Sequence, residues 1–173
     1  MVVTVAEEGN RRKGGMSIAE ARQCVNDTIT WFKRIDDFDC IEGSEEDLEP
    51  LAKATTMEVP TTLVCLLEAC KGSIWFAEKM GLSADGIVDA LGKFDFGDKL
   101  LPFAADEDQE YFLVINDKTG EVCEFESEDG TLGDVVGTSF ENYLESYSQS
   151  LMSNKYEYVE DCGLMEKAGA GRK

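Results

Sequence analysis

The stretch YFLVINDKTGEVCEFE, residues 111–126, decides the fold class because it encodes an antiparallel β-hairpin. Two runs rich in β-branched and aromatic residues flank the connection Asp-Lys-Thr-Gly at 117–120. Gly120 supplies the positive φ that such a connection often needs. Alternation in the second run puts Cys123 and Phe125 on the same face, and we expect one face of the hairpin to pack on helices.

A helical pattern precedes the hairpin at the start of the ordered chain. Residues 1–15 show no sustained period and end in two glycines, so we interpret them as a flexible tail. Ser17 and Glu20 then form a capping box, and apolar residues continue at helical spacing to about Ile35. The acidic segment 36–49 is interpreted as a loop.

Prolines and glycines mark the boundaries of the next two helices. Pro50 is expected to open a short helix whose inward face carries Leu51 and Ala54. Pro60 starts a second helix, which we expect to be buried and to end at Gly72. The apolar face of this second helix consists of Leu63, Leu66, Leu67 and Cys70.

Four further elements are indicated along the rest of the chain. Residues 73–77 have strand character, and Ser83 caps a short helix that Gly92 is expected to end. After the hairpin, Ser139 caps a helix with an apolar and aromatic stripe, and residues 156–159 read as a last short strand. The stripe consists of Phe140, Tyr143, Leu144, Tyr147 and Leu151.

The order of these elements predicts the architecture. Helices before and after an antiparallel hairpin, without alternating strands and helices, favour an α+β fold over a doubly wound parallel sheet. We predict a central antiparallel sheet in which the hairpin 111–126 packs against flanking helices. A length of 173 residues suits one domain, which we place at residues 16–166, followed by a loose C-terminal tail at 167–173.

The net charge restricts the partners. Thirty-six acidic residues against 16 basic ones give a formal charge of −20. Phosphate backbones are held mainly by Lys and Arg, so we expect no nucleic-acid partner, and anionic membranes are disfavoured for the same reason. A field of one sign favours fast association with a basic protein, but it also serves solubility alone, and both interpretations stay open.

Cysteine usage and the missing histidines exclude several kinds of site. The six cysteines form no Cys-x-x-Cys motif and the chain has no His, so we expect free thiols, no metal and no cofactor. No apolar run is long enough for a signal peptide or a membrane span. These features indicate a reducing compartment, with the cytoplasm as the first expectation and the nucleus as an alternative.

Catalytic motifs are missing as well. Without His, the Ser-His-Asp and Cys-His arrangements cannot form, and neither Gly-rich nucleotide-binding motif occurs. We therefore predict no enzymatic activity and assign no catalytic residue. An enzyme that uses carboxylates alone is the remote alternative, and a concave pocket holding two acids with raised pKa values would favour it.

Four segments in one order along the chain carry a family resemblance. They are Val59-Pro60 to Gly72, Leu101-Pro102-Phe103-Ala104 with the acidic residues after it, Gly120-Glu121-Val122 with Phe125, and Ser139-Phe140 with Tyr143-Leu144. Together they cover about residues 48 to 165. In this order they resemble the SUKH superfamily, the Smi/Knr-type domain named after a fungal cell-wall regulator. One departure is Asp108-Gln109-Glu110, which stands where the family often has Gly-Asp.

The resemblance implies a compact α+β fold without known catalysis that acts as a protein-interaction module. Within the family two roles recur: a regulatory or scaffold binding module, and an immunity protein that binds and neutralises a toxin. A basic, nuclease-type toxin would suit the charge of this chain. As the partner-binding residues we predict an exposed acidic loop next to the rigid hairpin, and a solvated loop without a binding role is the alternative. The loop consists of Asp106, Glu107, Asp108 and Glu110.

Overall fold

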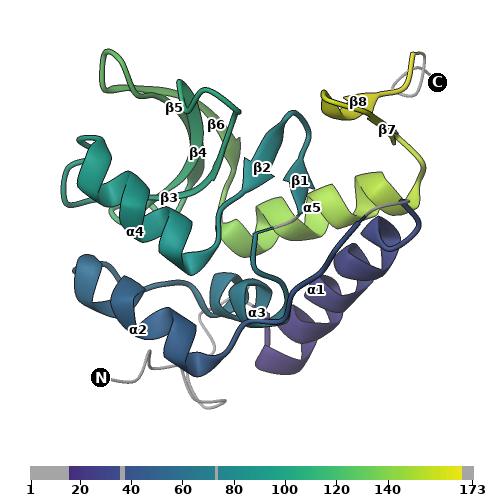
Figure 1. Cartoon of the computed structure of the whole chain (residues 1–173), viewed down its shortest axis with the longest axis horizontal. Helices are drawn as coiled ribbons and strands as arrows, with labels where there is room; N and C mark the ends of the chain where they lie inside the picture. The colour runs from purple at the N-terminus through teal and green to yellow at the C-terminus, as the bar shows by residue number, and fades with distance from the viewer. Residues whose placement is uncertain (1–15, 36–37, 73, 169–173) are drawn as a thin grey trace.

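The computed structural model describes residues 16–35, 38–72 and 74–168 and shows an α+β fold (Figure 1). The helices are α1 (Ile18–Phe32), α2 (Glu45–Ala54), α3 (Thr61–Ala69), α4 (Ala84–Lys93) and α5 (Phe140–Met152). The strands are β1 (Trp75–Phe76), β2 (Lys79–Gly81), β3 (Leu100–Ala105), β4 (Tyr111–Asn116), β5 (Val122–Glu126), β6 (Thr131–Gly137), β7 (Tyr156–Val159) and β8 (Gly163–Glu166). The tail predicted for residues 1–15 lies outside the described residues, as do Ser73 and residues 169–173 of the predicted C-terminal tail.

Six strands form one antiparallel sheet in the order β1-β2-β3-β4-β5-β6, and β7 pairs with β8 in a separate hairpin. The predicted hairpin 111–126 is confirmed as β4 and β5, whose register runs from Tyr111 opposite Glu126 to Ile115 opposite Val122. Gly120 in the connecting turn has φ +79°, as its position required. Figure 1 shows the sheet curling beside α4.

Both faces of the sheet are buried along β3 and β4, whereas the sequence had indicated one buried face. On one face, side chains of β3 and β4 such as Phe103 and Leu113 belong to the larger core, which also contains residues of α1, α3 and α5. On the other face, Phe112 and Phe125 pack with Phe96, which lies in the chain after α4. Burial on two sides explains why β3 and β4 read as nearly continuous apolar runs.

Helices α1, α3 and α5 begin and pack as predicted. The capping box of Ser17 and Glu20 is present at the start of α1, which ends at Phe32, three residues earlier than expected. Helix α3 is buried as predicted, but it ends at Ala69 and not at the expected Gly72. The predicted apolar residues from Leu63 to Cys70 belong to the core. The side chain of Ser139 accepts a hydrogen bond from the backbone of Asn142 and caps α5.

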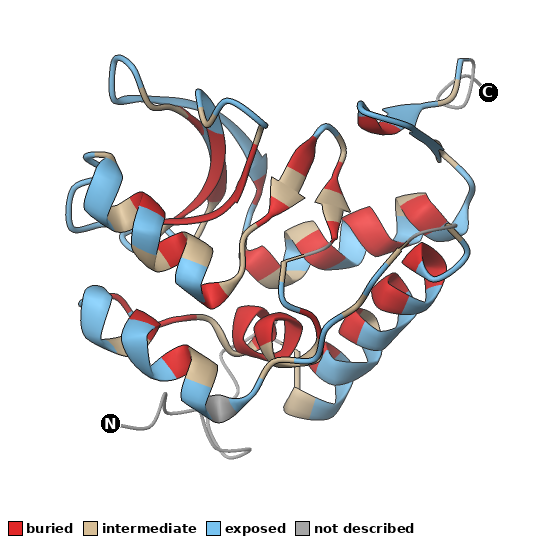
Figure 2. Cartoon of the chain, in the orientation of Figure 1, coloured by how far each residue is buried: buried red, intermediate tan, exposed pale blue. Residues whose placement is uncertain are grey.

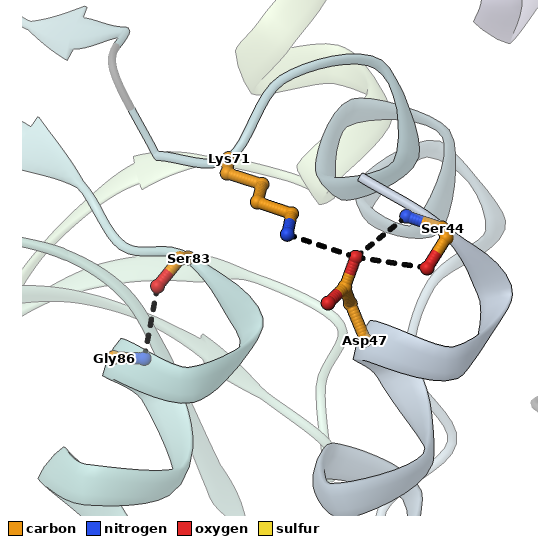
Figure 3. Close-up of polar contacts among 5 residues, drawn as sticks. All are labelled: Ser44, Asp47, Lys71, Ser83 and Gly86. Atoms are coloured by element: carbon orange, nitrogen blue, oxygen red, sulfur yellow. Dashed lines mark hydrogen bonds and ion pairs between the residues drawn. The ribbon is translucent and has the colours of Figure 1, made fainter. Parts of the chain in front are cut away.

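The prediction that Pro50 opens a helix is wrong, because α2 already begins at Glu45 and Pro50 lies inside it. The cause is Asp47, which accepts hydrogen bonds from the backbone N and Oγ of Ser44 and forms an ion pair with Lys71 at 3.1 Å (Figure 3). An interior proline costs about 3 kcal/mol. The cap contributes about 1 kcal/mol and each buried leucine about 2 kcal/mol, which offsets that cost.

The two leucines of α2 that supply this burial are Leu48 and Leu51, at 2% and 0% exposure. Ala54, which the sequence placed on the inward face, is exposed instead. The acidic segment 36–49 is therefore only partly a loop, because its last five residues are helical. The acidic residues concealed this helix start, since Asp and Glu are common in both loops and first helical turns.

Helix α4 confirms the predicted cap and corrects the predicted end. Ser83 accepts a hydrogen bond from the backbone N of Gly86 (Figure 3). Gly92 does not end the helix, which continues through Lys93. The chain leaves the helix at Phe94, whose backbone is extended and whose ring packs near Phe96 and Phe112. Aromatic packing on the sheet, and not glycine, decides where α4 ends.

Candidate functional site

The predicted acidic loop is the turn between β3 and β4, and one of its four carboxylates has a structural task. Oδ1 of Asp106 accepts a hydrogen bond from the backbone N of Tyr111 at 2.9 Å, and the backbone of Gln109 bonds back to Asp106 O. Asp106 is half-buried and closes the turn. The other three predicted residues, Glu107, Asp108 and Glu110, are exposed.

The sheet brings a second acidic turn against this one. Oγ of Ser127, just after β5, donates to the carbonyl oxygens of Gln109 and Glu110 at 2.8 and 3.2 Å. The β5–β6 turn therefore lies beside the β3–β4 turn at one end of the sheet. We call the carboxylates gathered there the acidic end. It consists of Glu107, Asp108, Glu110, Glu126, Glu128 and Asp129.

Basic side chains hardly offset the acidic end. Lys93 is the nearby cation, but its Nζ donates to the amide oxygen of Gln109 at 3.3 Å and lies 5.1 Å from the centre of the Phe94 ring. Among the described residues, no ion pair involves a carboxylate of the acidic end. Residues 119–154 also contain neither Lys nor Arg. The acidic end is thus a surface of one sign that can accept hydrogen bonds from Lys or Arg side chains.

A shallow cleft of about 500 Å³ opens next to the acidic end. It lies between the chain after α4 and the β5–β6 turn, with Phe96 and Phe125 at its base. Asp95, Glu128 and Asp129 contribute carboxylates to its wall. Its size falls within the range of small-molecule sites, but both rings are almost fully buried and expose little apolar surface to a ligand. The cleft therefore extends the acidic end toward α4.

Sequence reasoning found only half of the acidic end. It singled out the loop 106–110 because the charges there are contiguous. The second turn, with Glu128 and Asp129, is separated from it by the whole of the hairpin and becomes a neighbour only through the pairing of β4 with β5. The signal that could have found it is the register itself, which places Glu126 opposite Tyr111.

Strand β6 forms an open edge of the sheet beside the acidic end. It pairs with β5 on one side and is the last strand in the order. Six of its seven residues are exposed, as Figure 2 shows in pale blue. Leu132, Val135 and Val136 are 43%, 54% and 41% exposed, which is high for apolar residues in a strand. No strand was predicted between the hairpin 111–126 and the helix capped by Ser139, so β6 was missed.

The opposite edge is closed by the chain itself. Strand β1 has only two residues, and the backbone N of Leu164 in β8 donates to the carbonyl oxygen of Ala77 next to it, at 3.0 Å. The hydroxyl of Tyr147 on α5 donates to Trp75 O at 2.6 Å and accepts from Ala77 N at 3.1 Å. The predicted strand 156–159 is confirmed as β7, the partner of β8.

Shifted pKa values mark structural contacts and not a reactive pair. Hydrogen bonds from Lys71 and Ser44 lower the pKa of Asp47. Burial acts to raise the pKa of Glu78, but its hydrogen bond with Lys79 and a backbone hydrogen bond outweigh it, and the pKa lies below its ordinary value. Burial raises the pKa of the Cys24 thiol to about 11. In the described part of the chain, no group of three or more acidic or cysteine side chains is arranged to hold a metal ion.

Comparisons with known proteins give no independent assignment. No family model matches the chain, and no curated protein matches it. The described helices also include none that is both long and apolar enough to cross a membrane.

Proposed function

We propose that this protein is a non-enzymatic protein-interaction domain of the SUKH (Smi/Knr-type) class that acts as a regulatory or scaffold binding module. The resemblance of the four segments supports the class, and the observed α+β fold is of the kind that the resemblance implies. The observation that carries the binding role is the acidic end, where two turns present carboxylates with no ion pair to a described cation.

The acidic end suits a basic protein partner. Side chains that already have cationic neighbours would lose those contacts on binding, whereas the exposed carboxylates of the acidic end lose only water. The two turns also belong to hairpins whose strands are hydrogen-bonded within the sheet, so the charges are held on a rigid base. Rigid, one-signed surfaces raise the association rate and select against acidic partners.

A second candidate function is neutralisation of a basic, nuclease-type toxin. The specific observation in its favour is the same surface, because an acidic patch can occupy a cationic groove that otherwise binds nucleic acid. A single tight partner distinguishes this role from a scaffold, which binds several proteins. Both roles need the acidic end, so one set of variants tests them together.

The experiment is affinity capture of binding proteins with the full chain and two charge variants. In the test variant, Glu107, Asp108 and Glu110 are replaced by Lys. In the control, Glu49, Glu157 and Glu160 are replaced by Lys. Each substitution changes the charge by two units, so both variants move from −20 to −14. Asp106 is left unchanged in both because it closes the turn.

We expect the partner to be retained by the wild type and by the control, and to be lost by the test variant. Raising the ionic strength from about 0.1 M to about 1 M shortens the Debye length from about 10 Å to about 3 Å and should weaken the interaction. One stoichiometric basic partner supports the neutralising role, and several partners support the scaffold. Equal capture by all three proteins would disprove the acidic end as the binding surface.

A further inference from the structure

We propose that the outer edge of β6 binds an extended, basic segment of a partner protein as an additional antiparallel or parallel strand. This inference rests on the proposed function, because it names the mode in which the same end of the molecule takes its partner. It is carried by three observations on β6: its free edge, its exposed apolar side chains and the charge around it.

The first observation is the free edge. Among the described residues, the backbone of Thr131–Gly137 pairs only with β5, and no other hydrogen bond reaches its outer side. Seven residues span about 23 Å, at about 3.3 Å per residue, which is the length of an ordinary strand. Free amide and carbonyl groups in a row are the template that β-strand addition uses.

The second observation is where the apolar side chains lie. Leu132 is paired with Phe125 and Val135 with Cys123, so both continue the face that carries the smaller core cluster. Phe125 and Cys123 are buried, whereas Leu132 and Val135 are exposed at 43% and 54%. A strand laid against β6 would cover these two side chains and extend the apolar face by one strand.

The third observation is the charge, which selects the occupant. Natural proteins often protect an open edge with Lys, but residues 119–154 contain no basic residue. Asp134 lies at the middle of β6. A Cβ atom on Gly133 would lie 3.4 Å from the side chain of Glu124 on the neighbouring strand β5, whose last residue is Glu126 of the acidic end. A segment that alternates apolar and basic side chains matches both the exposed apolar side chains of this edge and its negative charge.

A second copy of this chain matches the edge poorly. In a symmetric antiparallel pair of β6 strands, the central residues of the two strands face each other, and the central residue is Asp134. Like charges directly opposite each other destabilise a strand pair. The repulsion adds to that between two molecules of charge −20. The charge therefore favours a basic partner over self-association.

The test uses the full chain and synthetic peptides that alternate lysine and valine over the length of β6. Amide chemical shifts are followed by NMR during titration at low ionic strength. One control peptide has glutamate for lysine. A second keeps the lysines but carries N-methyl groups on alternate amides, which removes hydrogen bonds along one edge and leaves the charge unchanged.

We expect the lysine peptide to shift the amides of residues 131–137, and each control peptide to bind at least about tenfold more weakly. In the protein, Val135→Lys with Val136→Lys should weaken binding by about tenfold or more. The matched control, Val159→Lys with Met165→Lys on the exposed β7–β8 hairpin, should bind the peptide as the wild type does.

Several outcomes overturn the inference. Equal binding of the N-methylated peptide, with shifts confined to the acidic end, shows charge attraction without strand addition. A doubled mass in light scattering shows that a second copy covers the edge. In a third outcome, the peptide binds the variant Val3→Glu with Val5→Glu but not the wild type. The occupant of the edge is then the segment Val2-Val3-Thr4-Val5 of this chain, whose sequence favours a β-strand. The N-terminal segment joins the domain at Met16, whose backbone N donates to Glu141.

The outcomes also separate this inference from the proposed function. In one outcome, the variant Val135→Lys with Val136→Lys captures the partner as well as the wild type does, and the acidic-end variant loses it. This outcome supports the proposed binding function and rules out strand addition at β6. Absence of any stoichiometric partner in the capture experiment overturns the proposed function. The peptide titration still decides whether β6 accepts a strand.

Discussion

The two edges of the six-stranded sheet differ, because the β1 edge is covered by other parts of the chain and the β6 edge is open. At β1 the edge is two residues long, the β7–β8 hairpin lies against it through Leu164, and the hydroxyl of Tyr147 binds the backbone on both sides of Phe76. At β6 the edge is seven residues long and exposes its apolar side chains.

The closed edge of this protein depends on a few close contacts. Gly163 packs so closely on Trp75 that a Cβ atom would lie 2.5 Å from the ring. At β6 only the last residue, Gly137, is packed this closely, against Tyr143 of α5, and residues 131–136 are exposed. An unpaired strand edge can pair with another chain, and the proposed strand addition at β6 rests on this property.

The largest expected effect comes from breaking the closed edge at its tightest point. Gly163→Ala puts a Cβ against Trp75 at a backbone φ of +86°, so it should cost about 3 kcal/mol of unfolding free energy. The control Gly130→Ala lies at φ +63° in the turn before β6 with no atom within 4 Å of the new Cβ, and should cost about 1 kcal/mol. Urea unfolding followed by circular dichroism measures both. Equal losses would show that the hairpin does not press on Trp75.

The next effect comes from the hydrogen bonds of the closed edge. Tyr147→Phe removes a hydroxyl that serves Trp75 O and Ala77 N, so it should cost about 2 kcal/mol. Tyr143 is the matched control because its ring is parallel to that of Tyr147 at 6.2 Å, while its hydroxyl bonds to no described residue. Tyr143→Phe should stay within about 0.5 kcal/mol. A similar loss in both variants would assign the effect to the rings and not to the hydroxyl.

The same hydroxyl makes the closed edge sensitive to alkaline pH. Burial raises the pKa of Tyr147 well above its ordinary value of about 10, against the opposing effect of its backbone hydrogen bond with Ala77. A raised folded-state pKa gives stability that is present below about pH 10 and is lost as the pH rises further. The stability advantage of the wild type over Tyr147→Phe should therefore shrink by about 1.4 kcal/mol between pH 9 and pH 11. A constant difference across this range would mean that the hydroxyl is not buried.

The smallest effect on stability is expected at the open edge. Val135→Lys with Val136→Lys changes two exposed side chains that contribute little to the core, so each should alter the unfolding free energy by no more than about 0.5 kcal/mol. This near neutrality is what makes the pair useful as a binding variant. A loss of several kcal/mol would show that β6 is covered in solution.

Local sequence patterns predicted the structure correctly at helix caps and at the central hairpin. Ser17 with Glu20, Ser83 and Ser139 each cap the helix that the sequence assigned to them. The hairpin 111–126 follows from alternation and from Gly120. In these segments the backbone preference and the tertiary environment agree, so reasoning from neighbours in sequence is enough.

Local signals failed where packing overrode preference. Pro50 lies within α2 because the cap at Ser44 and the burial of Leu48 and Leu51 outweigh the lost hydrogen bond. Gly92 remains helical because the aromatic residues after it fix the end of α4. Strand β2 has only three residues, too few for periodicity to identify, and β6 contains two glycines and an aspartate, which are depleted in strands.

The fold class, the capped helices, the central hairpin and the strongly acidic character of this protein follow from its amino-acid sequence. Three features emerge only in the folded chain: the turns at 106–110 and 127–130 form one acidic end, the C-terminal hairpin closes β1, and β6 is left open. The physical reason is that caps and alternation act between residues a few positions apart. Which charges become neighbours and which edge meets solvent depend on strand register and packing between distant segments.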